Sequence, residues 1–204
     1  MTAADLRRPA LLPLALVLAA GIGYGVSVAA VRPYQAALAY QRIGDPDLTF
    51  PQRLDEARRS FDGAPTSANT LRRSIIVDLA NAARDVPVAL RSAAETFVAE
   101  ESKRGLEAEP RDARLLRGYV TYRQATARDS RDLDAIDALI GHLVDQAPHK
   151  VTTQRVLVLQ EVLRLRPQRA LELIDRYVAQ APITANDFAD LRQVAQAMAG
   201  RVGR

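Results

Sequence analysis

The chain has 204 residues without cysteine or tryptophan, and its 28 lysines and arginines against 24 acidic residues give a formal net charge of +4. The lack of cysteine excludes a disulfide framework and a thiolate metal site. The length allows one helical domain with a sizeable core, but not two large ones. Basic residues are spread among acidic ones instead of forming a stripe with aromatic residues, so the sequence predicts no nucleic-acid partner.

The first expected element is an apolar run over residues 9–31, which contains no charged side chain. About 20 such residues in a helix cross the hydrocarbon of a bilayer. Two arginines precede the run and only Arg32 follows it directly, which favours a cytoplasmic N-terminus. The run therefore predicts a single-pass transmembrane helix, with residues 1–8 in the cytoplasm and residues 32–204 exported.

A cleaved secretory signal is the alternative for the same run, since Ser27-Val28-Ala29 has the small-x-small pattern of a cleavage site. The run is longer than a typical signal core, which favours a retained anchor. Gly21 and Gly25 have the small-xxx-small spacing that lets two membrane helices approach closely. They predict a homo-oligomeric contact through the membrane helix.

Behind this run, apolar residues recur at helical spacing between proline and glycine breaks, and no stretch alternates as a strand does. The expected fold class is all-α, a chain of antiparallel hairpins. Ser130 is the predicted N-cap of one helix, and Thr184 with Asp187 has the capping-box spacing for the last. The predicted helices cover residues 34–42, 51–62, 67–83, 87–109, 115–126, 133–146, 152–165, 168–180 and 184–198.

An internal period is the most specific signal after the apolar run. Pro148 and Pro182 each follow an alanine and lie 34 residues apart, which is the period of the tetratricopeptide repeat. The clearest repeats then cover about 111–148 and 149–182, and stacked hairpins of this kind form an α-solenoid. An irregular helical bundle is the alternative, because the tryptophan and the Leu-Gly pair of the consensus repeat are missing.

Residues 31–40 (VRPYQAALAY) resemble the end of the last membrane helix in bacterial O-antigen ligase and polymerase-like proteins. Residues 105–124 and 139–182 are similar to the repeat tail that many of those proteins carry after that helix. The resemblance implies a place in the bacterial inner membrane with the repeats in the periplasm. It also implies an accessory role in envelope polysaccharide assembly or export, by docking other envelope proteins. The family's transfer chemistry needs many membrane helices, so no catalytic residue is carried over.

The reactive side chains of the sequence form no pattern typical of catalysis or cofactor binding, so neither an enzyme nor a cofactor is predicted. His142 and His149 are the only histidines, and Pro148 interrupts the helix between them, so no metal site is predicted. No Gly-x-Ser-x-Gly motif is present. Carboxylate clusters such as Glu100-Glu101 stand beside basic residues, which is typical of ion pairs on a helix surface.

Four arginines are the candidate binding residues, because the first helix of each hairpin lines the binding surface of a helical-repeat protein. Arg114, Arg117 and Arg123 lie on one such helix and Arg155 lies on the next. Guanidinium groups bind carboxylates in a bidentate manner, so this basic patch fits an acidic peptide or an anionic glycan. The alternative is that these arginines pair with carboxylates of their own chain.

The function predicted from the sequence is therefore a membrane-anchored protein-interaction module. A periplasmic scaffold or chaperone-like factor for secreted proteins is the first alternative. A glycan-processing enzyme is the second.

Overall fold

The computed structural model describes residues 20–21, 23–25 and 27–202, and in these residues every regular element is a helix. The chain divides into two compact units, with the boundary between Leu71 and Arg72. The all-helical architecture agrees with the period-3.6 pattern of apolar residues, which leaves each helix one apolar face to bury.

The predicted transmembrane helix at 9–31 is wrong as far as the structure describes the chain. No helix among the described residues is both long and apolar enough to cross a bilayer, which also overturns the predicted single-pass inner-membrane location. Residues 9–19, 22 and 26 of the predicted segment lie outside the described residues. The segment ends in a π-helical turn, η1 (Ser27–Val31), that continues directly into the next helix.

The first unit is built around a pair of helices, α2 (Arg32–Arg42) and α3 (Phe50–Gly63). The small side chains of Ala36 and Ala39 are buried on α2, which lets α3 approach closely. At Gly63 a Cβ atom would lie 2.9 Å from the Cβ of Ala36, so only glycine fits there without movement. An ion pair of 3.2 Å between Arg42 and Glu56 links the same two helices.

The second unit contains most of the helices. α4 (Ala68–Asn81) starts before the unit boundary. Its second half approaches α6 (Ala113–Thr126) closely at Gly118, where a Cβ would lie 3.3 Å from both Ile76 and Val77. The remaining elements follow in chain order: α5 (Val88–Ala108), α6 (Ala113–Thr126), α7 (Ser130–Gln146), α8 (Val151–Leu163), α9 (Pro167–Gln180), the 3-10 helix η2 (Pro182–Phe188) and α10 (Ala189–Val202).

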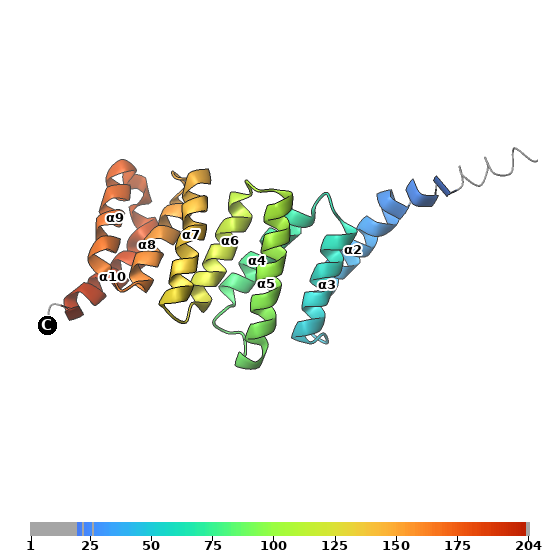
Figure 1. Cartoon of the computed structure of the whole chain (residues 1–204), viewed down its shortest axis with the longest axis horizontal. Helices are drawn as coiled ribbons and strands as arrows, with labels where there is room; N and C mark the ends of the chain where they lie inside the picture. The colour runs from blue at the N-terminus through green and yellow to red at the C-terminus, as the bar shows by residue number, and fades with distance from the viewer. Residues whose placement is uncertain (1–19, 22, 26, 203–204) are drawn as a thin grey trace, which may run out of the picture. The chain divides into compact units, whose positions relative to one another are not determined.

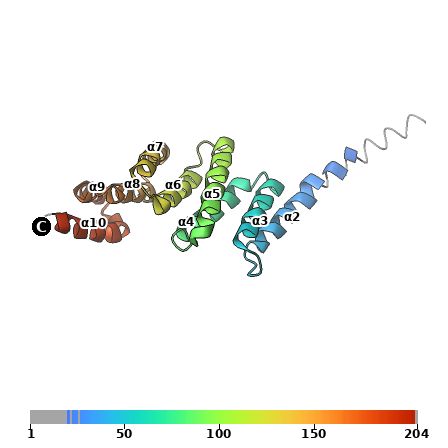
Figure 2. The same cartoon turned by 60° about the horizontal axis from the view of Figure 1, so that its bottom comes forward.

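The helices from α6 to α10 pack as successive hairpins, α6 with α7 and α8 with α9, followed by α10 (Figures 1 and 2). Contacts also run from α6 to α8 and from α8 to α10, so these three helices form one continuous layer. Two apolar cores hold the stack together. One is centred on Val120, Ile136 and Ile140, and the other on Val158, Ile174 and Phe188.

The structural period differs from the one in the sequence. Ala113, Val151 and Ala189 begin α6, α8 and α10, so the hairpins repeat every 38 residues. The two prolines lie 34 residues apart because each follows the second helix of its hairpin, two residues after Gln146 and two after Gln180. The segment from Val151 to Gln180 is shorter than the one from Ala113 to Gln146, and η2 fills the difference before α10.

Two predicted caps are wrong. The N-cap of α7 is Asp129, not Ser130, and its Oδ1 accepts hydrogen bonds from the backbone N–H groups of Arg131 and Asp132 at 2.9 and 3.0 Å. Thr184 does not cap the last α-helix, because its hydroxyl donates to the carbonyl of Ala181 at 2.7 Å within η2. The last α-helix consequently begins only at Ala189.

Leu165 ends α8 in a left-handed conformation, with φ of 57° and a side chain that is 75% exposed. The N–H of Arg166 donates to the carbonyl of Glu161 at 2.9 Å, and the N–H of Leu165 donates to the carbonyl of Val162 at 3.0 Å. This is the Schellman arrangement, in which glycine is the usual residue at the left-handed position.

Leu165→Gly is expected to raise the free energy of unfolding by about 0.5–1 kcal/mol, because glycine removes the Cβ strain of about 1–2 kcal/mol and loses part of that gain to its freer unfolded state. Urea unfolding of the full chain measures the change. Leu165→Ala is the control, since alanine keeps the Cβ and is expected to change little. A lower midpoint for the glycine variant than for the alanine variant would contradict the strain.

Candidate functional site: an inner groove lined by α6, α8 and α10

An open hollow of about 320 Å³ crosses the continuous layer of helices in the second unit, and we call it the inner groove. α6 and α8 each contribute one face, since their lining residues recur every three or four positions, and α10 contributes one residue. The lining residues are Arg117, Thr121 and Gln124 from α6, Thr152, Arg155, Val156 and Leu159 from α8, and Leu191 from α10.

The α6 side of the inner groove is tied to α8 by polar contacts. The Nη1 of Arg117 donates to the hydroxyl of Thr152 at 2.7 Å. Deeper down, the side chain of Gln124 is 4% exposed, and its Nε2 donates to the carbonyl of Val156 at 3.0 Å and to the Oε1 of Gln160 at 3.1 Å. These bonds fix the α6 face of the groove relative to the α8 face.

Arg155 forms the most directional contact at the inner groove. Its Nη1 and Nη2 donate to the two carboxylate oxygens of Asp190 at 2.9 and 2.7 Å, a bidentate pair between α8 and the first turn of α10. The hydrogen bond from Arg155 holds the pKa of Asp190 below its ordinary value, and the same bond raises the pKa of Arg155 above its own. Both groups therefore remain charged throughout the neutral range.

The four predicted arginines do not form one patch. Arg117 and Arg155 both line the inner groove. Arg114 is exposed near the start of α6, and among the described residues it has no ion-pair partner. Arg123 lines a different hollow, where its Nη2 lies 3.5 Å from a carboxylate oxygen of Asp132.

The predicted contact between two membrane helices through Gly21 and Gly25 has no support in the described residues. Gly21 and Gly25 are exposed, and a Cβ at either position would meet nothing within 4 Å. The described part of the chain offers no membrane-spanning helix in which this pair would act.

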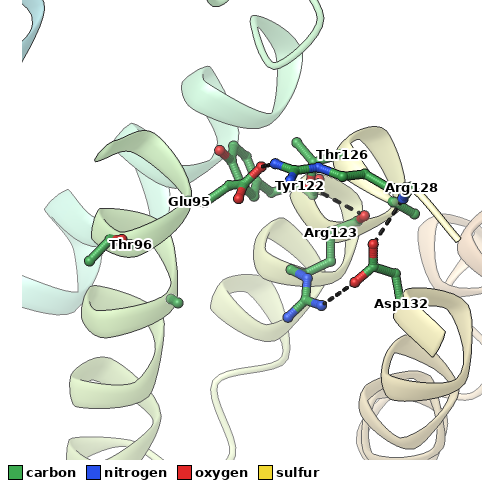
Figure 3. Close-up of a pocket in the computed structure, with 9 residues that line it drawn as sticks. Glu95, Thr96, Tyr122, Arg123, Thr126, Arg128 and Asp132 are labelled. Carbon is green, nitrogen blue, oxygen red and sulfur yellow. Dashed lines mark hydrogen bonds and ion pairs between the residues drawn. The ribbon is translucent and has the colours of Figure 1, made fainter. Parts of the chain in front are cut away.

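The second hollow, of about 350 Å³, lies between α5, α6 and the start of α7 (Figure 3). Arg128 pairs with Glu95, and Arg123 extends toward Asp132, so two cations face two carboxylates. Burial raises the pKa of Tyr122 to about 12, and the nearby Glu95 carboxylate adds to the effect.

Because its charges are already matched, this hollow is the weaker candidate for binding a charged ligand. Of its charged residues only Arg123 was predicted as a binding residue, because Glu95 and Arg128 are 33 positions apart and on different elements.

Metal binding has no support in the described residues, where no three His, Asp or Glu side chains lie close enough to hold an ion. His142 and His149 are both exposed. No protein family, no curated protein and no solved structure matches this chain. The resemblance to the tails of O-antigen ligase-like proteins therefore stays a prediction, and the inner groove itself is the basis for a functional proposal.

Proposed function

We propose that the second unit is a protein-interaction module and that its inner groove binds an extended acidic segment of a partner protein. The observation that supports this most is the combination of two guanidinium groups, Arg117 and Arg155, with apolar side chains on neighbouring helices. A charged fork beside an apolar surface fits a peptide that carries both carboxylates and apolar side chains.

The shape of the inner groove favours a peptide over a small molecule. Sites for small molecules enclose most of their ligand, whereas this hollow is open and spreads over three helices. Alternate side chains of an extended peptide point to opposite sides. A short segment in which acidic and apolar residues alternate therefore presents acidic groups along one side and apolar groups along the other. The hydroxyls of Thr121 and Thr152 are placed to bond the backbone of such a segment.

The resemblance to the tails of O-antigen ligase-like proteins suggests which partners to test. Proteins that assemble or export envelope polysaccharides are the first to test. An anionic glycan is the competing ligand, because its carboxylates also suit guanidinium groups. The glycan is less suited to the apolar part of the groove, formed by Val156, Leu159 and Leu191.

Arg117→Ala is expected to weaken binding of a fluorescein-labelled ten-residue peptide of alternating glutamate and leucine by about tenfold. A hydrogen bond to a charged group contributes about 1.5–3 kcal/mol, and 1.4 kcal/mol corresponds to a factor of ten. Fluorescence anisotropy with the full chain measures the dissociation constant.

The matched control is Arg176→Ala, which removes the same charge from an exposed position on α9, outside the inner groove. It is expected to change the affinity less than twofold. A glutamine-leucine peptide is the second control. Equal binding of both peptides, equal weakening by both variants, or binding of polygalacturonate in place of the peptide would reject the proposal.

A further inference from the structure

The Arg155–Asp190 ion pair sits at the edge of the inner groove and engages one of its two arginines. Both hydrogen bonds of the pair are short, and they use the same fork of guanidinium nitrogens that would receive a ligand carboxylate. The Arg155 side chain is 35% exposed and that of Asp190 is 62% exposed, so an incoming peptide can reach the pair from solvent.

The pair is not what holds α10 in place. α10 and η2 pack onto α8 and α9 through Phe188, Leu191 and Ala195, which are all buried in one apolar core. An exposed ion pair adds little to stability by comparison. Asp190 also lies in the first turn of α10, where a negative charge is favoured by the helix dipole even without a partner. Opening the pair therefore leaves the packing of α10 intact.

We propose that Asp190 is an internal competitor that occupies, in the free protein, the position a ligand carboxylate takes on Arg155. The inference rests on the proposed function of the inner groove and specifies its ligand. A peptide carboxylate binds the Nη1–Nη2 fork of Arg155 only by replacing Asp190, so a single acidic group gains little at that fork.

A ligand with a second carboxylate gains more, because Arg117 is on the neighbouring helix and holds only the neutral hydroxyl of Thr152. Packed helices lie about 8–10 Å apart, and carboxylates two residues apart in an extended chain are separated by about 7 Å. The long side chains of Arg117 and Arg155 have enough rotatable bonds to adapt to this difference. The site is thus selective for segments with at least two acidic residues at alternate positions.

The test compares Asp190→Asn with the unmodified full chain, using the labelled glutamate-leucine peptide and fluorescence anisotropy. Asparagine keeps the size of the side chain and removes the competing charge, so the affinity is expected to rise about three- to tenfold. The double variant Asp190→Asn with Arg155→Gln is expected to lose this gain, because the released guanidinium is then absent.

Asp175→Asn is the matched control. Asp175 also pairs with an arginine across two helices, at 2.7 Å from Arg192, and its side chain is 66% exposed, but it does not line the inner groove. Its replacement is expected to change peptide affinity less than twofold.

The outcomes separate the two proposals. Suppose that the unmodified chain binds the peptide and that Arg117→Ala weakens this binding. If Asp190→Asn then leaves the affinity unchanged or lowers it, Asp190 is not an internal competitor, but the proposal that the inner groove binds acidic peptides is still supported. An equal rise in affinity from Asp175→Asn would also contradict the role of Asp190 as an internal competitor, since the change in net charge of the chain would then explain the effect. If neither the unmodified chain nor Asp190→Asn binds the peptide, the proposed function fails, and the inference that depends on it fails too.

Discussion

Replacing Phe188 with alanine is expected to lower the free energy of unfolding by about 3–5 kcal/mol, the usual cost of removing a fully buried phenylalanine. The side chain is 0% exposed, and its ring stacks on Tyr177 with 6.0 Å between centroids. It lies at the end of η2 and packs into the core shared by α8, α9 and α10. The loss is measured from the midpoint and slope of urea unfolding of the full chain.

Ile183→Ala is the matched control for this prediction. Ile183 belongs to the same short 3-10 helix but is 93% exposed, so its truncation is expected to change the unfolding free energy by less than about 0.5 kcal/mol. Similar losses in both variants would show that the core around Phe188 does not hold the C-terminal helices.

Arg72→Met is expected to destabilise the chain by about 3–5 kcal/mol, because it removes a cation from a buried carboxylate. The Nε of Arg72 lies 3.0 Å from the Oε2 of Glu101, and the two side chains are 11% and 0% exposed. Arg104 also reaches Glu101 at 3.0 Å, but its own side chain is 55% exposed and in contact with water. Urea unfolding again measures the change.

Two further variants test the cause. Lys103→Met removes an exposed cation from α5, the helix that also carries Glu101. Lys103 lies 3.9 Å from Glu107, and its replacement is expected to lower the free energy of unfolding by less than about 0.5 kcal/mol. Arg72→Met combined with Glu101→Leu is expected to recover most of the loss, since the buried carboxylate is then removed together with the cation. A double variant no more stable than Arg72→Met would mean that packing, not charge, explains the effect.

Helix positions could be predicted from the sequence because they depend on local patterns. α9 begins and ends within one residue of its predicted bounds, where prolines and apolar periodicity mark both ends, whereas α7 ends at the predicted residue but begins three residues before the predicted start. η2 was not predicted, because Thr184 and Asp187 have the spacing of a capping box whichever structure forms. Burial of Phe188, a contact with distant helices, selects the 3-10 helix there.

The candidate site was only partly predictable for a related reason. Arg117 and Arg155 were placed on the correct helices, but a helix turns by about 100° per residue. Arg123 is six positions beyond Arg117, so the two side chains point about 120° apart around the helix, and Arg123 lines the other hollow. Asp190 was not predicted as the partner of Arg155, because the two are 35 positions apart and meet only through the path of η2.

Gln124 affects how far the hairpins can be treated as interchangeable modules. Its amide belongs to α6 but donates to α8, and the amide of Gln160 on α8 donates back to Leu133 and Asp137 on α7. A hairpin that is excised, duplicated or grafted elsewhere takes only half of this network along and leaves buried amides without partners. Recombination and consensus design must therefore move the segment from α6 to α8 as one block, with both glutamines retained.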